Sequence, residues 1–202
     1  MAVRDWPGVW RRFVGRGAYP HQFAFLLLLP LRNVIFSPYQ LVRRLHLTET
    51  SRVLELGPGP GFFSERVARS IPRGHLYLVD LQHQMLAKAR GRLRRAGLRN
   101  VSWTQANAMV LPFAPDTFDT VFLVAVLGEV PDAGECVESV FPVLRSGGML
   151  SVTELPGDPD LITEPDLVKL VCSKGFEHFE SFVLRGHGYT ANFRKAVSRG
   201  PG

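Results

Sequence analysis

The sequence predicts a doubly wound α/β fold, in which a mostly parallel sheet of seven strands carries helices on both faces. Three observations lead to this prediction. Short apolar runs alternate with stretches that place apolar residues at helical spacing. A glycine-rich turn, Gly57 to Gly61, joins the first apolar run directly to a helix. The last two expected strands are separated by a Gly-His-Gly turn, which suits an antiparallel hairpin strand at the C-terminal end.

The expected elements follow one another with a turn signal at most boundaries. Ser37 and Pro38 begin a helix that should run to about Leu47, because serine is a favoured N-cap and proline suits the first helical position. Gly97 and Gly175 end two later helices. The expected strands are residues 53–56, 75–79, 101–105, 118–125, 149–154, 176–184 and 189–196. The expected helices between the strands are residues 64–71, 81–96, 133–144 and 164–173.

The length of 202 residues predicts a single domain with a substantial core. Within it, residues 1–36 are expected to form a helical cover or lid, and residues 37–202 the main domain. The apolar segment 23–36 has two open interpretations, as a cover of the core or substrate pocket and as a peripheral membrane contact. Its longest apolar run has nine residues and contains Pro30, which is too short to span a bilayer.

Composition narrows the classes of function. The net charge is +6, but the basic residues are scattered along the chain, so a nucleic-acid partner is not favoured. The two cysteines, Cys136 and Cys172, have no metal-type spacing, and neither a disulfide framework nor a metal site is predicted. Because the N-terminus lacks the pattern of a secretory signal, a cytoplasmic location is the default expectation. Nothing in the sequence indicates an oligomeric state.

The glycine-rich turn predicts a nucleotide site. Glycine permits positive φ and leaves backbone bare, and the following helix offers unpaired N–H groups. Its spacing, with Gly57, Gly59 and Gly61, places the third glycine one residue earlier than in a dinucleotide fingerprint. Glu55 precedes the turn, where a carboxylate repels phosphates but suits an amino group. The predicted ligand is therefore a nucleoside with an ammonium group and no pyrophosphate, S-adenosylmethionine.

A second acid supports a nucleoside site. Asp80 lies 19 positions after Gly61, at the end of the next expected strand, where a carboxylate can accept hydrogen bonds from ribose hydroxyls. Asp is also a favoured helix N-cap, and an NAD site would use the same acid, so Asp80 alone does not decide. Ligands of such sheets bind outside the carboxyl ends of the strands. This rule gathers the glycine turn, Asp80, Asn107 and the segment after Ala125 at one edge.

The run Glu55 to Gly61 resembles motif I of the class I, Rossmann-like, S-adenosylmethionine-dependent methyltransferases. Leu111 to Phe113, the following Phe-Asp-Thr-Val and the later Arg145 to Gly148 also resemble this family. The chain is similar to the bacterial small-molecule methyltransferases of the type-11, UbiE-like group, roughly from Leu41 to Glu154. The resemblance implies that residues 37–202 form a methyltransferase domain. It also implies cofactor contacts from Glu55, Gly57, Gly59, Gly61, Asp80, Leu81, Asn107, Ala108 and Ala125, with Asn107 standing where the family usually has Asp.

The expected reaction is in-line transfer of a methyl group to a small, lipophilic acceptor. Because the donor is already activated, positioning and desolvation can do most of the work. Glu129 is the candidate catalytic residue, since the family often has a histidine or an acid facing the acceptor after the fourth strand. Residues 125–128 lack the Asn-Pro-Pro-Tyr signature of amine methylases. The alternatives are a non-catalytic binding protein with this fold, an NAD-dependent oxidoreductase and, on the basic pI alone, a nucleic-acid methylase.

Overall fold

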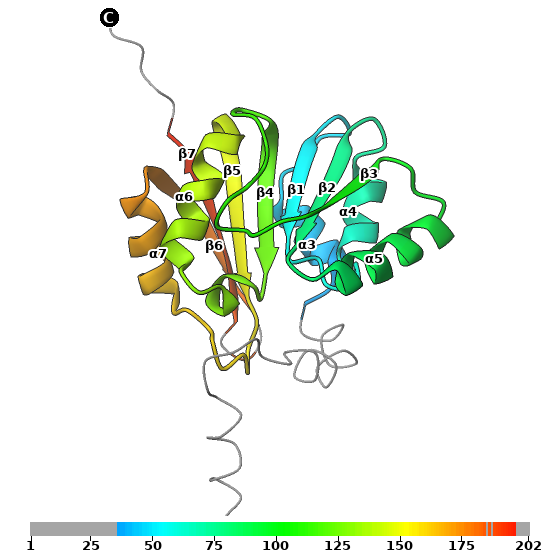
Figure 1. Cartoon of the computed structure of the whole chain (residues 1–202). Coiled ribbons are helices and arrows are strands. Elements are labelled where there is room, and N and C mark those ends of the chain that lie inside the picture. Colours follow the sequence, from blue (N-terminus) through cyan, green and yellow to red (C-terminus); the bar gives the residue numbers. More distant parts are fainter. Residues whose placement is uncertain (1–35, 185, 187, 197–202) are drawn as a thin grey trace, which may run out of the picture. The chain divides into compact units, whose positions relative to one another are not determined.

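The computed structural model describes residues 36–184, 186 and 188–196. All of them belong to one compact unit, residues 35–202. Its centre is a seven-stranded sheet with the order β3-β2-β1-β4-β5-β7-β6 (Figure 1). The strands from β3 to β5 are parallel neighbours, whereas β7 runs antiparallel to both β5 and β6. The predicted fold class is confirmed, including the C-terminal hairpin.

The helices and strands lie where the sequence predicts them, with one addition. The strands are β1 (Arg52–Leu56), β2 (His75–Asp80), β3 (Val101–Gln105), β4 (Phe118–Val124), β5 (Leu144–Glu154), β6 (Phe176–Val183) and β7 (Tyr189–Lys195). The helices are α3 (Pro38–Arg44), α4 (Ser64–Ser70), α5 (His83–Arg95), α6 (Ala133–Val143) and α7 (Glu164–Ser173). A short 3-10 helix, η1 (Leu127–Glu129), follows β4 and was not expected.

Two element boundaries differ from the prediction by more than two residues. Helix α3 has the expected serine cap, but it ends at Arg44 because His46 adopts φ +47°, which is incompatible with a continuing helix. Strand β5 begins at Leu144 rather than Met149, since Leu144 pairs with Phe118 before the register shifts. Gly147, at φ +71°, lies within this irregular stretch. Both differences arise at backbone irregularities rather than from a wrong periodicity.

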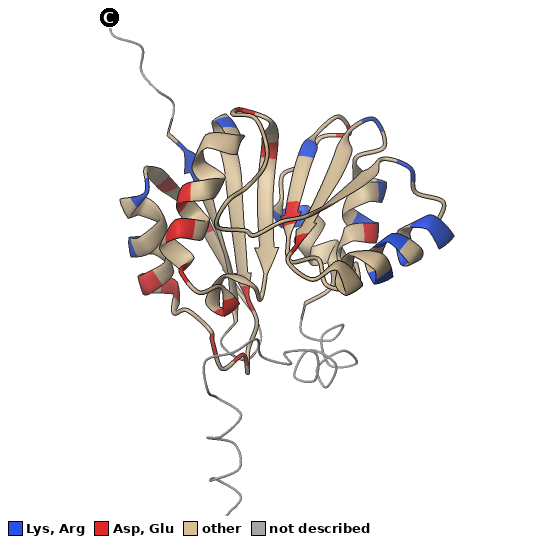
Figure 2. Ribbon diagram, viewed as in Figure 1, with Lys and Arg blue, Asp and Glu red and all other residues tan. Residues whose placement is uncertain are grey.

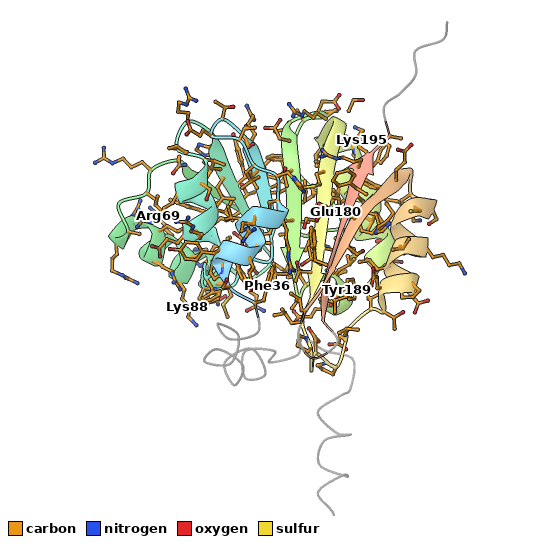
Figure 3. The ribbon with its side chains drawn as sticks, turned by 180° about the vertical axis from the view of Figure 1, so that it is seen from behind. Phe36, Arg69, Lys88, Glu180, Tyr189 and Lys195 are labelled. Atoms are coloured by element: carbon orange, nitrogen blue, oxygen red, sulfur yellow. The ribbon has the colours of Figure 1, made fainter. Side chains whose placement is uncertain are left out.

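The core has two halves, one on each face of the sheet. Successive strand residues point to opposite faces, so Leu54 packs with α6 and α7, while Val53 packs with α3, α4 and α5. Figure 1 shows α6 and α7 on the near side, and Figure 3, seen from behind, shows α3 there with the buried Phe36 beside it. Because helices cover both faces, the central strands are nearly continuous apolar runs.

Charge is distributed unevenly over the described residues. Figure 2 shows Lys and Arg along α5, and Asp and Glu around α6 and α7. The basic residues that look scattered in the sequence are therefore partly gathered on one helix, where Arg90 and Arg94 lie 4.8 Å and 5.7 Å from the centre of the Trp103 ring. No helix in the described part of the chain is long and apolar enough to cross a membrane. Residues 23–35 of the apolar segment lie outside the described residues.

Candidate functional site

The glycine turn between β1 and α4 has the backbone that the sequence predicts. Gly57, Gly59 and Gly61 adopt φ values of +65°, +53° and +78°, a region that other residues rarely occupy. A Cβ atom at Gly57 would lie 2.5 Å from a γ-carbon of Val126, which follows β4. A Cβ atom at Gly61 would lie 3.1 Å from Ala89 of α5. The turn therefore needs glycine at both positions, for conformation and for space.

Asp80, the last residue of β2, faces this turn. Its carboxylate accepts a hydrogen bond from the Gln82 N–H at 2.8 Å and another from the Gly59 N–H. Burial raises the pKa of Asp80, and these two hydrogen bonds act in the opposite direction. The N-cap of α5 is Gln82 rather than Asp80, so the N-cap interpretation of this acid is wrong.

Glu55 lies beneath the turn, on β1. It is 3% exposed, and its carboxylate accepts a hydrogen bond from the Ser64 hydroxyl at 2.5 Å. Ser64 is the first residue of α4, so this bond ties the strand before the turn to the helix after it. The structure thus places a carboxylate directly behind the glycines. Its contact with an ammonium group stays a prediction.

The loops after β2 and β3 lie side by side, because Asp80 pairs with Gln105 across the two strands. Leu81 is 68% exposed, and its carbonyl accepts a hydrogen bond from the Gln105 side chain at 3.0 Å. Asn107 is exposed, and its side-chain oxygen accepts a hydrogen bond from the Met109 N–H at 2.9 Å. The Ala108 carbonyl accepts one from the Ser139 hydroxyl at 2.5 Å. One acceptor position on Asn107 is therefore already used within its own loop.

The segment after β4 carries the remaining predicted residues. Ala125 adopts φ +53°, unusual for a residue with a Cβ atom, while its N–H donates to the Thr153 carbonyl at 2.8 Å. This bend directs Val126 towards Gly57. Glu129, the candidate catalytic residue, is exposed in η1 and lies close enough to Glu154 to affect its ionisation. The structure thus groups Ala125 with the glycine turn and Glu129 with a second carboxyl group.

Sequence reasoning missed Glu154, the last residue of β5. It is 1% exposed, and its Oε1 has no hydrogen-bond partner among the described residues. Burial, together with the nearby Asp158 and Glu129, raises the pKa of Glu154 to about 8. An acid at the carboxyl end of a parallel strand is the same signal that identified Asp80. That signal was present at Glu154, but its unusual environment could not be known from the sequence.

The chemistry of these residues suits S-adenosylmethionine. The glycines present bare backbone, and Asp80 faces them from the neighbouring strand. A carboxylate has about four lone-pair positions, so the two backbone hydrogen bonds to Asp80 leave room for hydroxyl donors. Among the described residues no cluster of His, Cys, Asp and Glu could hold a metal ion. A hollow of about 350 Å³ between α5 and β3 is lined by Arg90 and Trp103, among others, and by no residue of the glycine turn.

Replacement of Asp80 by alanine is expected to weaken S-adenosylmethionine binding by about 1–3 kcal/mol, the usual loss when polar groups are left unpaired. Isothermal titration calorimetry of both proteins measures the difference. Glu138→Ala is a matched control, because Glu138 is an exposed acid on α6 that pairs with Lys174. Unchanged affinity in Asp80→Ala would remove Asp80 from the ribose role.

Comparisons with known proteins identify a methyltransferase domain within the chain. Residues 53–148 match the family model described as a methyltransferase domain. The "Ubiquinone/menaquinone biosynthesis C-methyltransferase UbiE" of Vibrio vulnificus and that of Pasteurella multocida are each 40% identical to this chain over 105 residues, or 51% of it. The matched region covers 40% and 39% of these relatives. The chain thus matches only about two fifths of the length of the curated relatives.

Solved structures agree in fold. A "SAM dependent methyltransferase from Aquifex aeolicus" has a TM-score of 0.77 at 19% identity, covering 83% of this chain and 94% of the other. The "[4+2]-Cyclase SpnF" has a TM-score of 0.73 at 19% identity, covering 80% and 81%. At such identities the likeness shows the fold alone. The matched residues 53–148, just under half of the chain, include the glycine turn, Asp80, Asn107 and the segment after β4, and this part of the chain is a class I S-adenosylmethionine-dependent methyltransferase domain.

Proposed function

We propose that this chain transfers a methyl group from S-adenosylmethionine to a carbon atom of a small, lipophilic, quinol-type acceptor. The observation that carries the proposal is the 40% identity to UbiE proteins over 105 residues. It is supported by the geometry of the glycine turn, whose Gly59 N–H contacts Asp80. The acceptor class comes from the relatives' name, which places them as C-methyltransferases in ubiquinone and menaquinone biosynthesis.

Each predicted site residue has a proposed role. Asp80 accepts hydrogen bonds from the ribose hydroxyls, and the backbone of the glycine turn lies against the methionine part of the cofactor. Glu55, behind the turn, attracts the ammonium group. The adenine ring lies between the loops after β2 and β3, where the exposed Leu81 supplies apolar contact. Asn107, Ala108 and Ala125 complete the set of residues around the adenine ring and the methionine end of the cofactor.

The chemistry is an in-line displacement. The cofactor supplies a methyl group already activated by a positive sulfur. The residues of this chain orient the two reactants and exclude water, and such positioning lowers the barrier of the displacement itself. A ring carbon attacks well only after a ring hydroxyl loses its proton. C-methylation of a quinol therefore requires a base beside the bound quinol, and Glu129 is one candidate for this role.

Three measurements test the proposal in sequence. Calorimetry with S-adenosylmethionine and S-adenosylhomocysteine should give binding, and no heat at millimolar ligand would end the assignment. Anaerobic incubation with methyl-labelled S-adenosylmethionine and reduced 1,4-naphthoquinone, which has a free ring carbon, should give a ring-methylated product. A mixture with NADH should show no fluorescence enhancement, since hydride transfer is the alternative that the family match disfavours.

A second candidate is a binding protein that holds the cofactor without transferring its methyl group. It is favoured by the likeness to SpnF, which is named a cyclase although it has this fold with a TM-score of 0.73. A fold does not determine chemistry. Cofactor binding without turnover on reduced quinones, phenols and thiols would support this candidate.

A further inference from the structure

We propose that Glu154 is the proton acceptor of the methyl-transfer reaction and removes the proton of the acceptor's ring hydroxyl. This inference rests on the proposed function and names a catalytic group for it. It is independent of the sequence resemblance, which implies no role for Glu154. The position of this residue, its surroundings and its proton affinity support the assignment.

Glu154 is located at the edge of the sheet where the glycine turn lies. Val124 of β4 pairs with Thr153 of β5, and the next residue, Ala125, donates its N–H to the Thr153 carbonyl. Glu154 therefore lies level with the bend at Ala125 and Val126. Val126 in turn approaches Gly57 so closely that a Cβ atom there would clash. Glu154 and the glycine turn are thus connected through one short segment.

One oxygen of the Glu154 carboxyl group, Oε1, is buried without a hydrogen-bond partner among the described residues. Tyr189 is opposite Glu154 in the strand register, and Figure 3 labels it at the start of β7. The Tyr189 hydroxyl, however, donates to the Ile162 carbonyl at 2.6 Å. No ion pair involves Glu154 among the described residues. A buried polar group without a partner is unusual and calls for a functional explanation.

Among the residues that the structure describes, the charged groups that act on the Glu154 carboxyl are acidic. Glu129 from η1 and Asp158 from the loop after β5 both raise its pKa, in addition to burial. Tyr189 of β7 stays neutral, because burial raises the pKa of its hydroxyl, and Glu154 itself, followed by Glu164 and Asp166 of α7, raises it further. Burial and these two acids make Glu154 a stronger base than an ordinary carboxylate. At neutral pH it holds a proton in most molecules.

Two backbone segments enclose this region. A Cβ atom at Gly128 in η1 would lie 1.9 Å from the Asp160 carbonyl oxygen, so η1 and the loop after β5 are in direct backbone contact. Glu129 and Asp158, which both act on Glu154, belong to these two segments. Glu154 itself is 1% exposed. A carboxyl group that is so little exposed keeps the proton affinity that its surroundings give it.

A base of this strength suits a weakly acidic hydroxyl. The efficiency of general base catalysis is greatest when the pKa of the base is near the working pH, and such a group typically contributes about 10²–10⁴ in rate. The ionised Glu154 takes the hydroxyl proton, and the released electron pair makes the ring carbon nucleophilic. The carbon forms a bond to the methyl group while the carbon–sulfur bond breaks, leaving its electron pair on sulfur. The ring carbon then loses its proton to solvent, and Glu154 returns its proton to the oxygen.

The test compares Glu154→Gln with the unaltered chain in the reduced 1,4-naphthoquinone assay across pH 6 to 9. For the unaltered chain kcat/KM should rise with pH and level off above about 8. Glu154→Gln should lose about 10²–10⁴ in kcat/KM and the dependence on pH. Asp158→Asn should keep the rate but move the rise to lower pH, because one nearby negative charge is removed. Glu138→Gln is the surface control. A Glu154→Gln protein with unchanged rate and profile would overturn the proposal.

A second readout does not depend on activity. Infrared spectra should show the carbonyl stretch of a protonated carboxylic acid at pH 6.5 that disappears by pH 9 and is absent in Glu154→Gln. An ionised Glu154 at pH 6.5 would also overturn the proposal. Circular dichroism and S-adenosylmethionine affinity confirm that the variant folds. If the unaltered chain binds cofactor but transfers no methyl group, the proposed function itself fails, a result distinct from an active enzyme in which Glu154→Gln changes nothing.

Discussion

Replacing Gly57 by alanine is expected to reduce S-adenosylmethionine affinity by about 100-fold, where 1.4 kcal/mol corresponds to a factor of ten. Two effects combine. Gly57 has φ +65°, and a left-handed backbone costs a residue with a Cβ atom about 1–2 kcal/mol. The new Cβ atom would also lie 2.5 Å and 2.9 Å from the two γ-carbons of Val126, so the segment after β4 must move. Calorimetry on the folded variant measures the loss.

Two further variants separate the effects. Gly97 has φ +75°, and a Cβ atom at this position would meet nothing within 4 Å, so Gly97→Ala has the backbone strain without the clash. It should lose stability but keep its affinity for the cofactor. In Gly57→Ala with Val126→Ala the γ-carbons are absent, and part of the affinity should return. Cofactor binding by Gly57→Ala at the level of the unaltered chain would show that this turn does not hold the ligand.

Glu154→Gln is expected to change how the free energy of unfolding depends on pH. The pKa of Glu154 is about 8 in the folded chain and near 4.5 without its environment. Between these values the folded state holds a proton that the unfolded state has released, so the unaltered chain loses stability as pH rises. The slope is at most about 1.4 kcal/mol per pH unit. Below about 4.5 and above about 8 this residue contributes no slope, since both states then have the same protonation.

Urea unfolding at pH 5.5, 6.5, 7.5 and 8.5 measures this effect. Glutamine cannot ionise, so the stability of Glu154→Gln relative to the unaltered chain should increase steadily across the series. Glu138→Gln is the control, because Glu138 lies on the exposed surface of α6, and its curve should run parallel to that of the unaltered chain. Parallel curves for Glu154→Gln would mean that the buried carboxyl ionises at an ordinary pH.

Much of the fold was predictable because its signals are local. Strand β3 (Val101–Gln105) and helix α7 (Glu164–Ser173) have the bounds that periodicity and turn residues predict. The glycine turn was also recognisable, because glycine adopts positive φ readily, and Gly57, Gly59 and Gly61 all do so. The boundaries that could not be predicted, at His46 and Leu144, depend on a left-handed residue without glycine and on pairing with a distant strand.

The sequence by itself determined the alternation of strands and helices, the glycine turn and the presence of acids at strand ends. Only the tertiary structure decided the contacts and the burial of each of these acids. It turned Asp80 towards the Gly59 N–H, brought Val126 against Gly57, and buried Glu154 between two acidic loops. The physical reason is the distance along the chain over which each interaction acts. Backbone preference and helix capping act over a few residues, whereas the hydrogen-bond partners and proton affinity of a side chain depend on segments that strand order and packing bring together.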